Sequence, residues 1–198
     1  MLRIRLYCLC MAHRITVIEL LLDQTSDATV RQIWRSLAGT GVTTPVVYDS
    51  RPHITLAACG RLAADDFRDV LSAFAAAAPA FPLAFASIGI FLAEETAVLF
   101  LAPVVTRELL ALHERFFHRV GGFADDWEQY SQPGNWVPHC TLAMRLASSE
   151  LGGATEICSR LRLPLHGRIE QIGVADVFPD RIASRHTYAL TRAIDEPR

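Results

Sequence analysis

The sequence predicts a fold of mixed helices and strands in two related halves, and a repeated hexapeptide is the first observation behind this prediction. Residues 52–57 read PHITLA and residues 138–143 read PHCTLA, so the two histidines lie 86 residues apart. With this composition, a random order of residues would give roughly 0.003 copies of the pattern Pro-His-x-Thr-Leu. Repetition at so long a period indicates two related structural units.

The order of the expected elements is the second observation. In each half, the strand that carries the hexapeptide is followed by a helix and then by two strands. No low-complexity linker separates the halves, although they share little identity outside the motif. We therefore expect one domain over residues 14–193, with tails at 1–13 and 194–198. The first tail can also be interpreted as a misassigned start, with Met11 as the initiator.

The first elements follow from apolar spacing and capping residues. Residues 15–22 are typical of a buried strand, and Ser26 or Asp27 can cap a helix that ends near residues 39–41. Apolar side chains recur at helical spacing in this helix at Val30, Ile33, Trp34 and Leu37. After the first motif strand, a second helix ends at Pro79. Its apolar face is Phe67, Val70, Leu71 and Phe74.

The rest of the chain is read in the same way. In order, the expected elements are strands at 81–92 and 96–102, a helix from Thr106 to Val120, a loop at 123–135, the second motif strand, a weak helix around 154–161 and strands near 165–177 and 185–193. The first two strands form a hairpin that turns at residues 94–95. The glycine pair at 121–122 ends the helix.

Composition excludes several classes of enzyme. The chain of 198 residues contains no lysine, and its 19 basic residues are all arginine. P-loop enzymes, Schiff-base and pyridoxal phosphate enzymes, and ligases with a nucleotidyl-lysine intermediate all need a lysine. Any RNA-joining activity would therefore have to reverse phosphodiester cleavage without ATP. We expect no cofactor.

Net charge limits the kinds of binding partner that we expect, and cysteine content indicates the cellular compartment. A net charge of −2 gives no global basic field for long nucleic acid, so a small nucleotide or the end of an RNA fits better. Five scattered cysteines without a Cys-x-x-Cys pair argue against a zinc ribbon and favour the reduced cytoplasm. No stretch approaches the length of a membrane span, and no obligate protein partner is evident.

The motif itself predicts a chemistry. In a strand, residues two apart share a face, so His53 lies beside Thr55 and His139 beside Thr141. If the two strands meet, one neutral imidazole can act as a base while a protonated one acts as an acid. The threonine hydroxyls can donate to the oxygens of an anion held between them. A phosphoryl displacement needs these parts and no metal.

Two arginines near the motifs are weaker candidates. Arg51 lies two residues before His53, about 7 Å along a strand, and is a possible second-shell phosphate contact. Arg145 lies six residues after His139, about 20 Å along a straight strand, which would put its side chain out of reach. Tyr48 and Trp136 could stack on a base, but core packing or a lid contact explains each of them better. His113 is better explained by packing than by a chemical role.

The paired His-x-Thr motifs, each followed by a leucine, resemble those of the 2H phosphoesterases. The likeness is greatest to a bacterial branch called 2'-5' RNA ligase or RNA 2',3'-cyclic phosphodiesterase. The segments GIF at 89–91, LFLAP at 99–103 and WVPH at 136–139 are also similar to that branch. The resemblance covers most of the chain, from about residue 14 to about residue 193.

This resemblance implies a bilobal α+β fold, with two pseudo-symmetric lobes of antiparallel sheet, helices outside and a cleft between them. It implies a metal-independent phosphodiesterase and does not fix the substrate. We expect hydrolysis of 2',3'-cyclic phosphates of nucleotides or RNA ends. His53 and His139 would be the catalytic pair, in an undetermined order of acid and base, and Thr55 and Thr141 would bind the phosphate.

Several alternatives stay open within the same site. They are a reversible 2'-5' RNA ligase or 2',5'-phosphodiesterase, an enzyme for an ADP-ribose cyclic phosphate, and a non-catalytic module that binds nucleotides or RNA. The sequence has no Gly-x-Ser-x-Gly elbow and no metal-ligand spacing, which argues against acyl or metal-dependent hydrolysis.

Overall fold

The computed structural model describes residues 14–60, 62, 67–93 and 95–191. The predictions for the tails at 1–13 and 194–198, and for Glu94 in the hairpin turn, lie outside the described residues. Within the described part, none of the helices combines the length and the apolar character that crossing a membrane would take.

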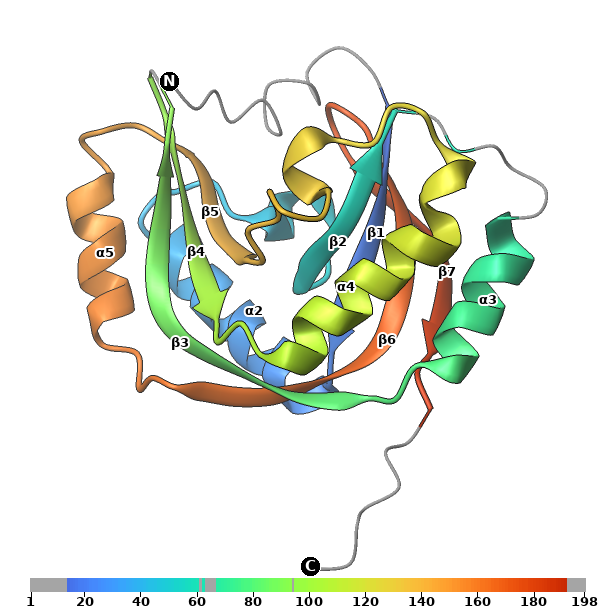
Figure 1. The fold of residues 1–198 in the computed structure, drawn as a ribbon. Helices are drawn as coiled ribbons and strands as arrows, with labels where there is room; N and C mark the ends of the chain where they lie inside the picture. The colour runs from blue at the N-terminus through green and yellow to red at the C-terminus, as the bar shows by residue number, and fades with distance from the viewer. Residues whose placement is uncertain (1–13, 61, 63–66, 94, 192–198) are drawn as a thin grey trace, which may run out of the picture.

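Seven antiparallel strands form one sheet in the described part of the chain. They are β1 Ile15–Leu22, β2 His53–Cys59, β3 Phe81–Leu92, β4 Ala97–Pro103, β5 Cys140–Leu146, β6 Leu165–Val177 and β7 Ile182–Ala189. The strand order is β2-β1-β6-β3-β4-β5, and β7 pairs with β6. The motif strands β2 and β5 therefore lie at opposite ends of this order. The sheet curves so strongly that they come together on its concave side (Figure 1).

The sheet carries the internal duplication that the repeated motif predicted. The chain runs β1-α2-β2-α3-β3 and then repeats this order of element types as β4-α4-β5-α5-β6. When β1 is matched with β4, β2 with β5 and β3 with β6, the strand order reads the same from both ends. The long strands β3 and β6 pair through residues 81–85 and 165–169, and this pairing joins the two lobes. The predicted bilobal α+β fold is thus confirmed, with β7 as an addition to one lobe.

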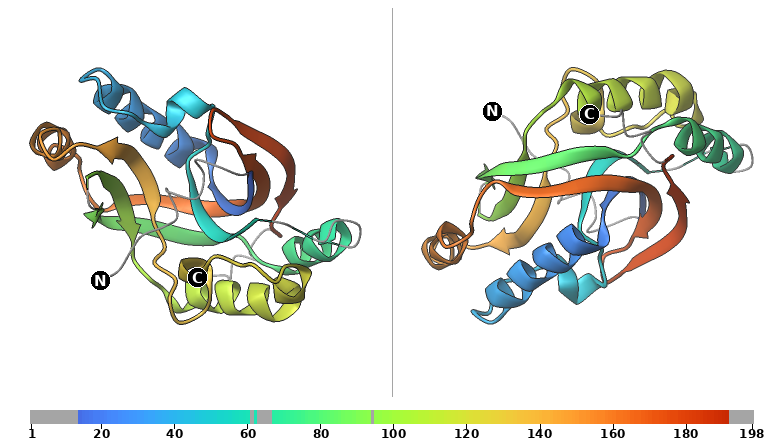
Figure 2. Two further views of the ribbon diagram at one scale, coloured as in Figure 1. Left: turned by 90° about the horizontal axis from the view of Figure 1, so that it is seen from above. Right: turned by 90° about the horizontal axis from the view of Figure 1, so that it is seen from below.

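The helices follow the same two-fold relation. Their bounds are α2 Gln24–Ala38, α3 Phe67–Ala77, α4 Arg107–Val120 and α5 Leu151–Ser159, with short 3-10 turns η1 Pro45–Tyr48, η2 Gly121–Phe123 and η3 Gln129–Ser131. α2 and α5 lie along one flank of the curved sheet, and α3 and α4 lie along the other (Figure 2). Because α2 matches α4 and α3 matches α5, each flank carries one helix of each kind.

The cap of α2 differs from the prediction, and the start of α4 differs by one residue. The Asp23 carboxylate accepts hydrogen bonds from the backbone N–H groups of Thr25 and Ser26, at 3.0 Å each. The Ser26 hydroxyl donates to the second oxygen of Asp23 at 2.7 Å, so Ser26 lies inside the first turn. In α4, the Thr106 hydroxyl accepts from the N–H of Leu109 and is the N-cap, so the helix begins at Arg107, one residue after the predicted start.

The last strands and helix shift from their predicted bounds by a few residues. β7 begins at Ile182, before the predicted 185, because Ile182 pairs with Val177 across a tight connection from β6. α5 begins at Leu151, three residues before the predicted start. The buried faces of the helices agree with the sequence: Val30, Ile33, Trp34 and Leu37 in α2, and Leu109, Leu112, Phe116 and Val120 in α4.

Candidate active site

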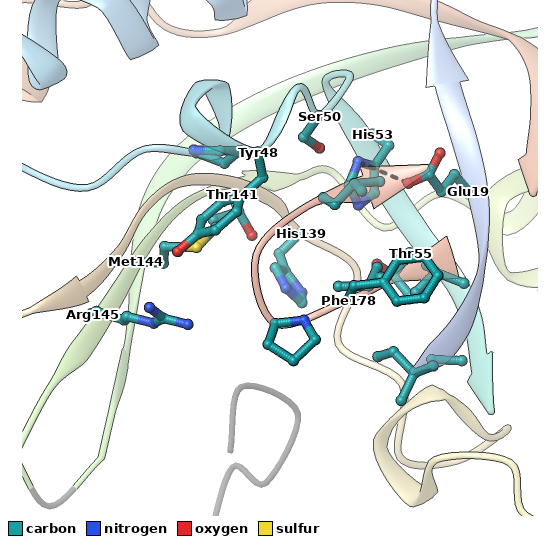
Figure 3. Close-up of a pocket in the computed structure, with 17 residues that line it drawn as sticks. Glu19, Tyr48, Ser50, His53, Thr55, His139, Thr141, Met144, Arg145 and Phe178 are labelled. Atoms are coloured by element: carbon teal, nitrogen blue, oxygen red, sulfur yellow. Dashed lines mark ion pairs between the residues drawn. The ribbon is translucent and has the colours of Figure 1, made fainter. Parts of the chain in front are cut away.

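The two motif strands bring all four predicted polar side chains to one cavity. His53 and Thr55 from β2, with His139 and Thr141 from the β5 side, line a pocket of about 110 Å³ (Figure 3). We call it the histidine pocket. Its other polar lining residues are Glu19, Tyr48, Ser50 and Arg145. Among the described residues, no three histidine, cysteine or acidic side chains are placed to hold a metal ion.

The leucine of each motif marks a β-bulge. The pairing register of β1 with β2 shifts between Thr55 and Ala57, which leaves Leu56 as an extra residue. The register of β4 with β5 shifts in the same way between Thr141 and Ala143, around Leu142. Both leucines are fully buried, at 0% exposure. A bulge changes which side chains face a given side of the sheet, so the residue five positions after each histidine also lines the pocket.

Each motif strand accepts a hydrogen bond from a tryptophan of the other half of the chain. Trp34 Nε1 donates to the carbonyl oxygen of Thr141, and Trp136 Nε1 donates to that of Thr55, both at 2.9 Å. The ring of Trp136 also stacks on buried His113, with centroids 4.0 Å apart. These contacts support the packing interpretation of Trp136 and His113 over a base-stacking role.

Both motif histidines are oriented by the same local hydrogen bond. His53 Nδ1 lies 2.7 Å from the carbonyl oxygen of Arg51, and His139 Nδ1 lies 2.8 Å from that of Val137. A carbonyl oxygen can only accept, so each Nδ1 carries a proton. Each Nε2 is then left for a group in the pocket.

The surroundings of the two imidazoles differ. His139 lies against the rings of Phe91 and Phe100, at centroid distances of 4.9 Å and 5.3 Å. Burial lowers the pKa of His139 to about 4, and the nearby charge of His53 adds to this, while the hydrogen bond to Val137 opposes it. On the other side of the pocket, Nδ1 of His53 lies 3.5 Å from Oε1 of buried Glu19.

The structure places the two arginines differently from the sequence expectation. The guanidinium of Arg51 lies 3.4 Å from the amide oxygen of Gln171, and Arg51 is not among the residues that line the histidine pocket. Its contribution is the carbonyl oxygen that orients His53. The phosphate contact of this side chain stays a prediction that the geometry does not favour.

The prediction for Arg145 is wrong, because this residue lines the histidine pocket. The estimate of its distance assumed a straight strand. The register of β5 slips a second time between Ala143 and Leu146, and Arg145 takes a positive φ of 56°. The strand bends there, and the guanidinium lies over the ring of Tyr48, 5.9 Å from its centroid. A residue other than glycine in this region of φ is strained, and such strain is commonest at functional sites.

Sequence reasoning also missed several lining residues, among them Glu19, Ser50 and Phe178. Glu19 interrupts an otherwise apolar part of β1, which is buried over its whole length. A lone carboxylate in a buried strand is a signal that could have found it. Ser50 precedes the first motif, and Phe178 sits in the turn after β6 with Arg181 4.2 Å above its ring. No pattern in the sequence singles out Phe178.

Comparison with known proteins agrees with this geometry. Residues 22–177 match the family model of the 2'-5' RNA ligase superfamily. No curated protein sequence matches the chain. Among solved structures, the protein TT0787 of Thermus thermophilus is similar with a TM-score of 0.61 and 18% identity, over 90% of this chain and 98% of that one.

Escherichia coli LigT is similar in several structures. The complex with 3'-AMP gives a TM-score of 0.58 and 16% identity, over 90% of this chain and 99% of that chain. The complex with phosphate gives 0.58 and 16%, over 90% and 98%. These likenesses show the fold, and the family match covers most of the described chain. The protein therefore belongs to the 2'-5' RNA ligase superfamily, the two-histidine phosphoesterases that its repeated hexapeptide resembles.

Proposed function

We propose that this protein is a metal-independent phosphodiesterase that opens the 2',3'-cyclic phosphate of a nucleotide or of an RNA end. One observation carries the proposal. Two imidazoles, each with Nδ1 bound to a backbone carbonyl, present their other nitrogen to a single pocket together with two threonine hydroxyls. This arrangement supplies an acid, a base and two hydrogen-bond donors around a site of phosphate size.

The different surroundings of the histidines support a division of roles. His139 is neutral at neutral pH because its pKa is about 4, so it can accept a proton. His53 lies beside the carboxylate of Glu19, with 3.5 Å between Nδ1 and Oε1, so we assign the role of the acid to His53 on this geometry. A bound phosphodiester brings a negative charge between them, which offsets the effect of the His53 charge on the pKa of His139.

The proposed reaction is a single displacement at phosphorus. Nε2 of His139 removes a proton from water as the water oxygen attacks the phosphorus atom. The bond from phosphorus to one ribose oxygen breaks, and Nε2–H of His53 protonates that oxygen. Thr55 and Thr141 donate to the other phosphoryl oxygens, and the cation of Arg145 faces the same pocket. The product is a phosphate monoester, and solvent returns the two histidines to their starting states.

The comparisons support a nucleotide or phosphate as ligand. The structures of E. coli LigT are described as complexes with 3'-AMP, ATP, NADP+ and phosphate. Ligands of that kind carry the tetrahedral oxyanion that the two threonines and Arg145 would bind here.

A second candidate is a phosphodiester with a nucleoside on each side, such as a 2',5'-linked dinucleotide. The observation that favours it is the position of two aromatic rings in the lining of the pocket. Tyr48 and Phe178 lie on opposite sides of His139 (Figure 3). A base on each side could stack on these rings in place of the guanidinium that lies over each of them, Arg145 over Tyr48 and Arg181 over Phe178.

A substrate panel tests both candidates. The purified protein would be mixed with 2',3'-cyclic mononucleotides, short RNAs with cyclic ends and 2',5'-linked dinucleotides, in the presence of EDTA. Phosphorus NMR would follow the products. We expect turnover of at least the cyclic phosphates to survive chelation. Loss of all turnover with EDTA and its return with a divalent ion would sink the acid–base mechanism.

A further inference from the structure

The carboxylate of Glu19 is a charged group in a place that normally excludes charge. All eight residues of β1 are buried, and Glu19 itself is 4% exposed. Burying a carboxylate is costly unless a cation or hydrogen bonds compensate it. Among the described residues, its ion-pair partner is His53, with 3.5 Å between Oε1 and Nδ1.

The sheet is built to accommodate this side chain. Glu19 pairs with Thr55 on β2 and with Gly173 on β6. A Cβ atom added at Gly173 would come within 3.2 Å of Oε2 of Glu19. Leu21 Cδ1 would lie at 3.0 Å, so the glycine leaves room for the side chains of both Leu21 and Glu19.

The charges around the histidine pocket make Glu19 distinctive. The second motif and β5 bring His139 and Arg145, and η1 brings Tyr48. Glu19 is the one acidic side chain among the residues that line the pocket. Its Oε1 lies 3.5 Å from Nδ1 of His53, so among the lining residues it is the group placed to pair with a cation at that imidazole. His139, by contrast, has aromatic rings in the corresponding position.

We propose that Glu19 is a positioning residue that holds His53 as an imidazolium, with Nδ1 toward Arg51 and Glu19 and the Nε2 proton toward the substrate. This inference rests on the proposed function, because it explains how one of two equivalent motifs becomes the acid. Glu19 does not touch the reacting atoms. It acts through His53, much as a buried carboxylate orients the histidine of a catalytic triad.

The test compares two substitutions of Glu19 with a matched control. Glu19→Gln keeps the shape and removes the charge, and Glu19→Asp keeps the charge on a shorter side chain. Glu156→Gln makes the same chemical change on the exposed face of α5, where the carboxylate pairs with Arg160. Rates of cyclic phosphate opening would be measured from pH 4 to 10, together with thermal melts.

We expect Glu19→Gln to lower kcat/KM by about 10- to 100-fold at neutral pH, a part of what a general acid supplies. The high-pH limb of its kcat/KM profile should move to lower pH, because the pair that holds the acidic proton is gone. In Glu19→Asp, kcat/KM and the position of the high-pH limb should both lie close to those of the wild type. Glu156→Gln should behave as wild type.

Three outcomes would overturn the inference. Wild-type rates and an unchanged limb in Glu19→Gln would show that the carboxylate has no part in the reaction. Equal losses in both Glu19 variants, with lowered melts and unchanged limbs, would show a structural role alone. Failure of the wild-type protein to open any cyclic phosphate or 2',5'-diester would instead refute the proposed function, and the role of Glu19 with it.

Discussion

The two copies of the motif share their backbone and differ in what surrounds their histidines. In both, Nδ1 is bound to the carbonyl two residues earlier, a leucine occupies a bulge, and an indole N–H is bound to the threonine carbonyl. Behind His53 lies the carboxylate of Glu19, whereas behind His139 lie the rings of Phe91 and Phe100. Duplication supplied two matching frames, and residues outside the motif made them chemically unequal.

This inequality is what an acid–base mechanism requires. Two identical imidazoles in one pocket could share a single proton, but either could hold it, so neither would be assigned to give or to take the proton. Environments that push two titratable groups apart are how active sites assign such roles. The contrast between the motifs can be tested by removing first what they share and then what distinguishes them.

The largest effect should come from the histidines themselves. We expect His53→Ala and His139→Ala each to lower kcat by about 10²- to 10⁴-fold, since each removes one proton-transfer group. The double variant should be little worse than either single one, because the groups act as a unit. Steady-state kinetics on a 2',3'-cyclic phosphate would measure this, with circular dichroism to show that folding is kept. A folded His139→Ala protein with near-normal turnover would refute the paired mechanism.

Substituting the threonines should lower activity less than substituting the histidines. Thr55→Ala and Thr141→Ala each remove one donor to the phosphoryl oxygens, and losing one such donor costs about 3 kcal/mol or less in the transition state. We expect the two variants to lose similar amounts, because both hydroxyls come from matching positions. Thr55→Ser and Thr141→Ser keep the donor and serve as controls. Loss in only one of the two alanine variants would mean that the phosphate is held by one motif.

Much of this fold could be read from the sequence, because the signals were local. The repeated hexapeptide predicted two matching strands, and apolar spacing predicted the buried faces of α2 and α4. The cap of α2 was missed because Asp23, Ser26 and Asp27 are all good capping residues. The choice depends on the hydrogen bond that the backbone N–H of Arg168, 145 residues away, donates to the Asp23 carboxylate.

The missed parts of the site share another cause. Arg145 reaches the histidine pocket because β5 slips register and bends, and a straight-strand estimate contains no bulge. Phe178 directly follows β6, and the pairing of β6 with β1, which in turn pairs with β2, is what brings this turn to the pocket. Glu19 could have been noticed as a charge in a buried strand, but its partner depends on strand pairing between β1 and β2. Long-range pairing decided each of these cases.

The motif leucines should affect stability and not chemistry. Leu56→Ala and Leu142→Ala each leave a cavity at a side chain that is 0% exposed, so each should lower the free energy of unfolding by about 2–5 kcal/mol. Urea denaturation would measure it, with Leu92→Ala as control, since Leu92 is 68% exposed and should change stability by less than about 0.5 kcal/mol. A change of under about 1 kcal/mol at Leu56 or Leu142 would contradict the packing described here.

Substitution of Phe91 should have the smallest effect on the rate at neutral pH. It tests the surroundings of His139 alone. Removing its ring in Phe91→Ala should admit water beside His139 and raise the pKa of that histidine from about 4 toward its ordinary value near 6.5.

A base works only above its pKa, so the low-pH limb of the kcat/KM profile should move to higher pH in Phe91→Ala, while the rate at pH 8 changes little. Phe123→Ala is the matched control, because Phe123 packs on Phe67 at 5.8 Å and does not line the histidine pocket. If the limb of Phe91→Ala stayed in place while that of Glu19→Gln moved, the aromatic rings would not be what keeps His139 neutral. If both limbs moved in opposite directions, the two environments would account for the two roles.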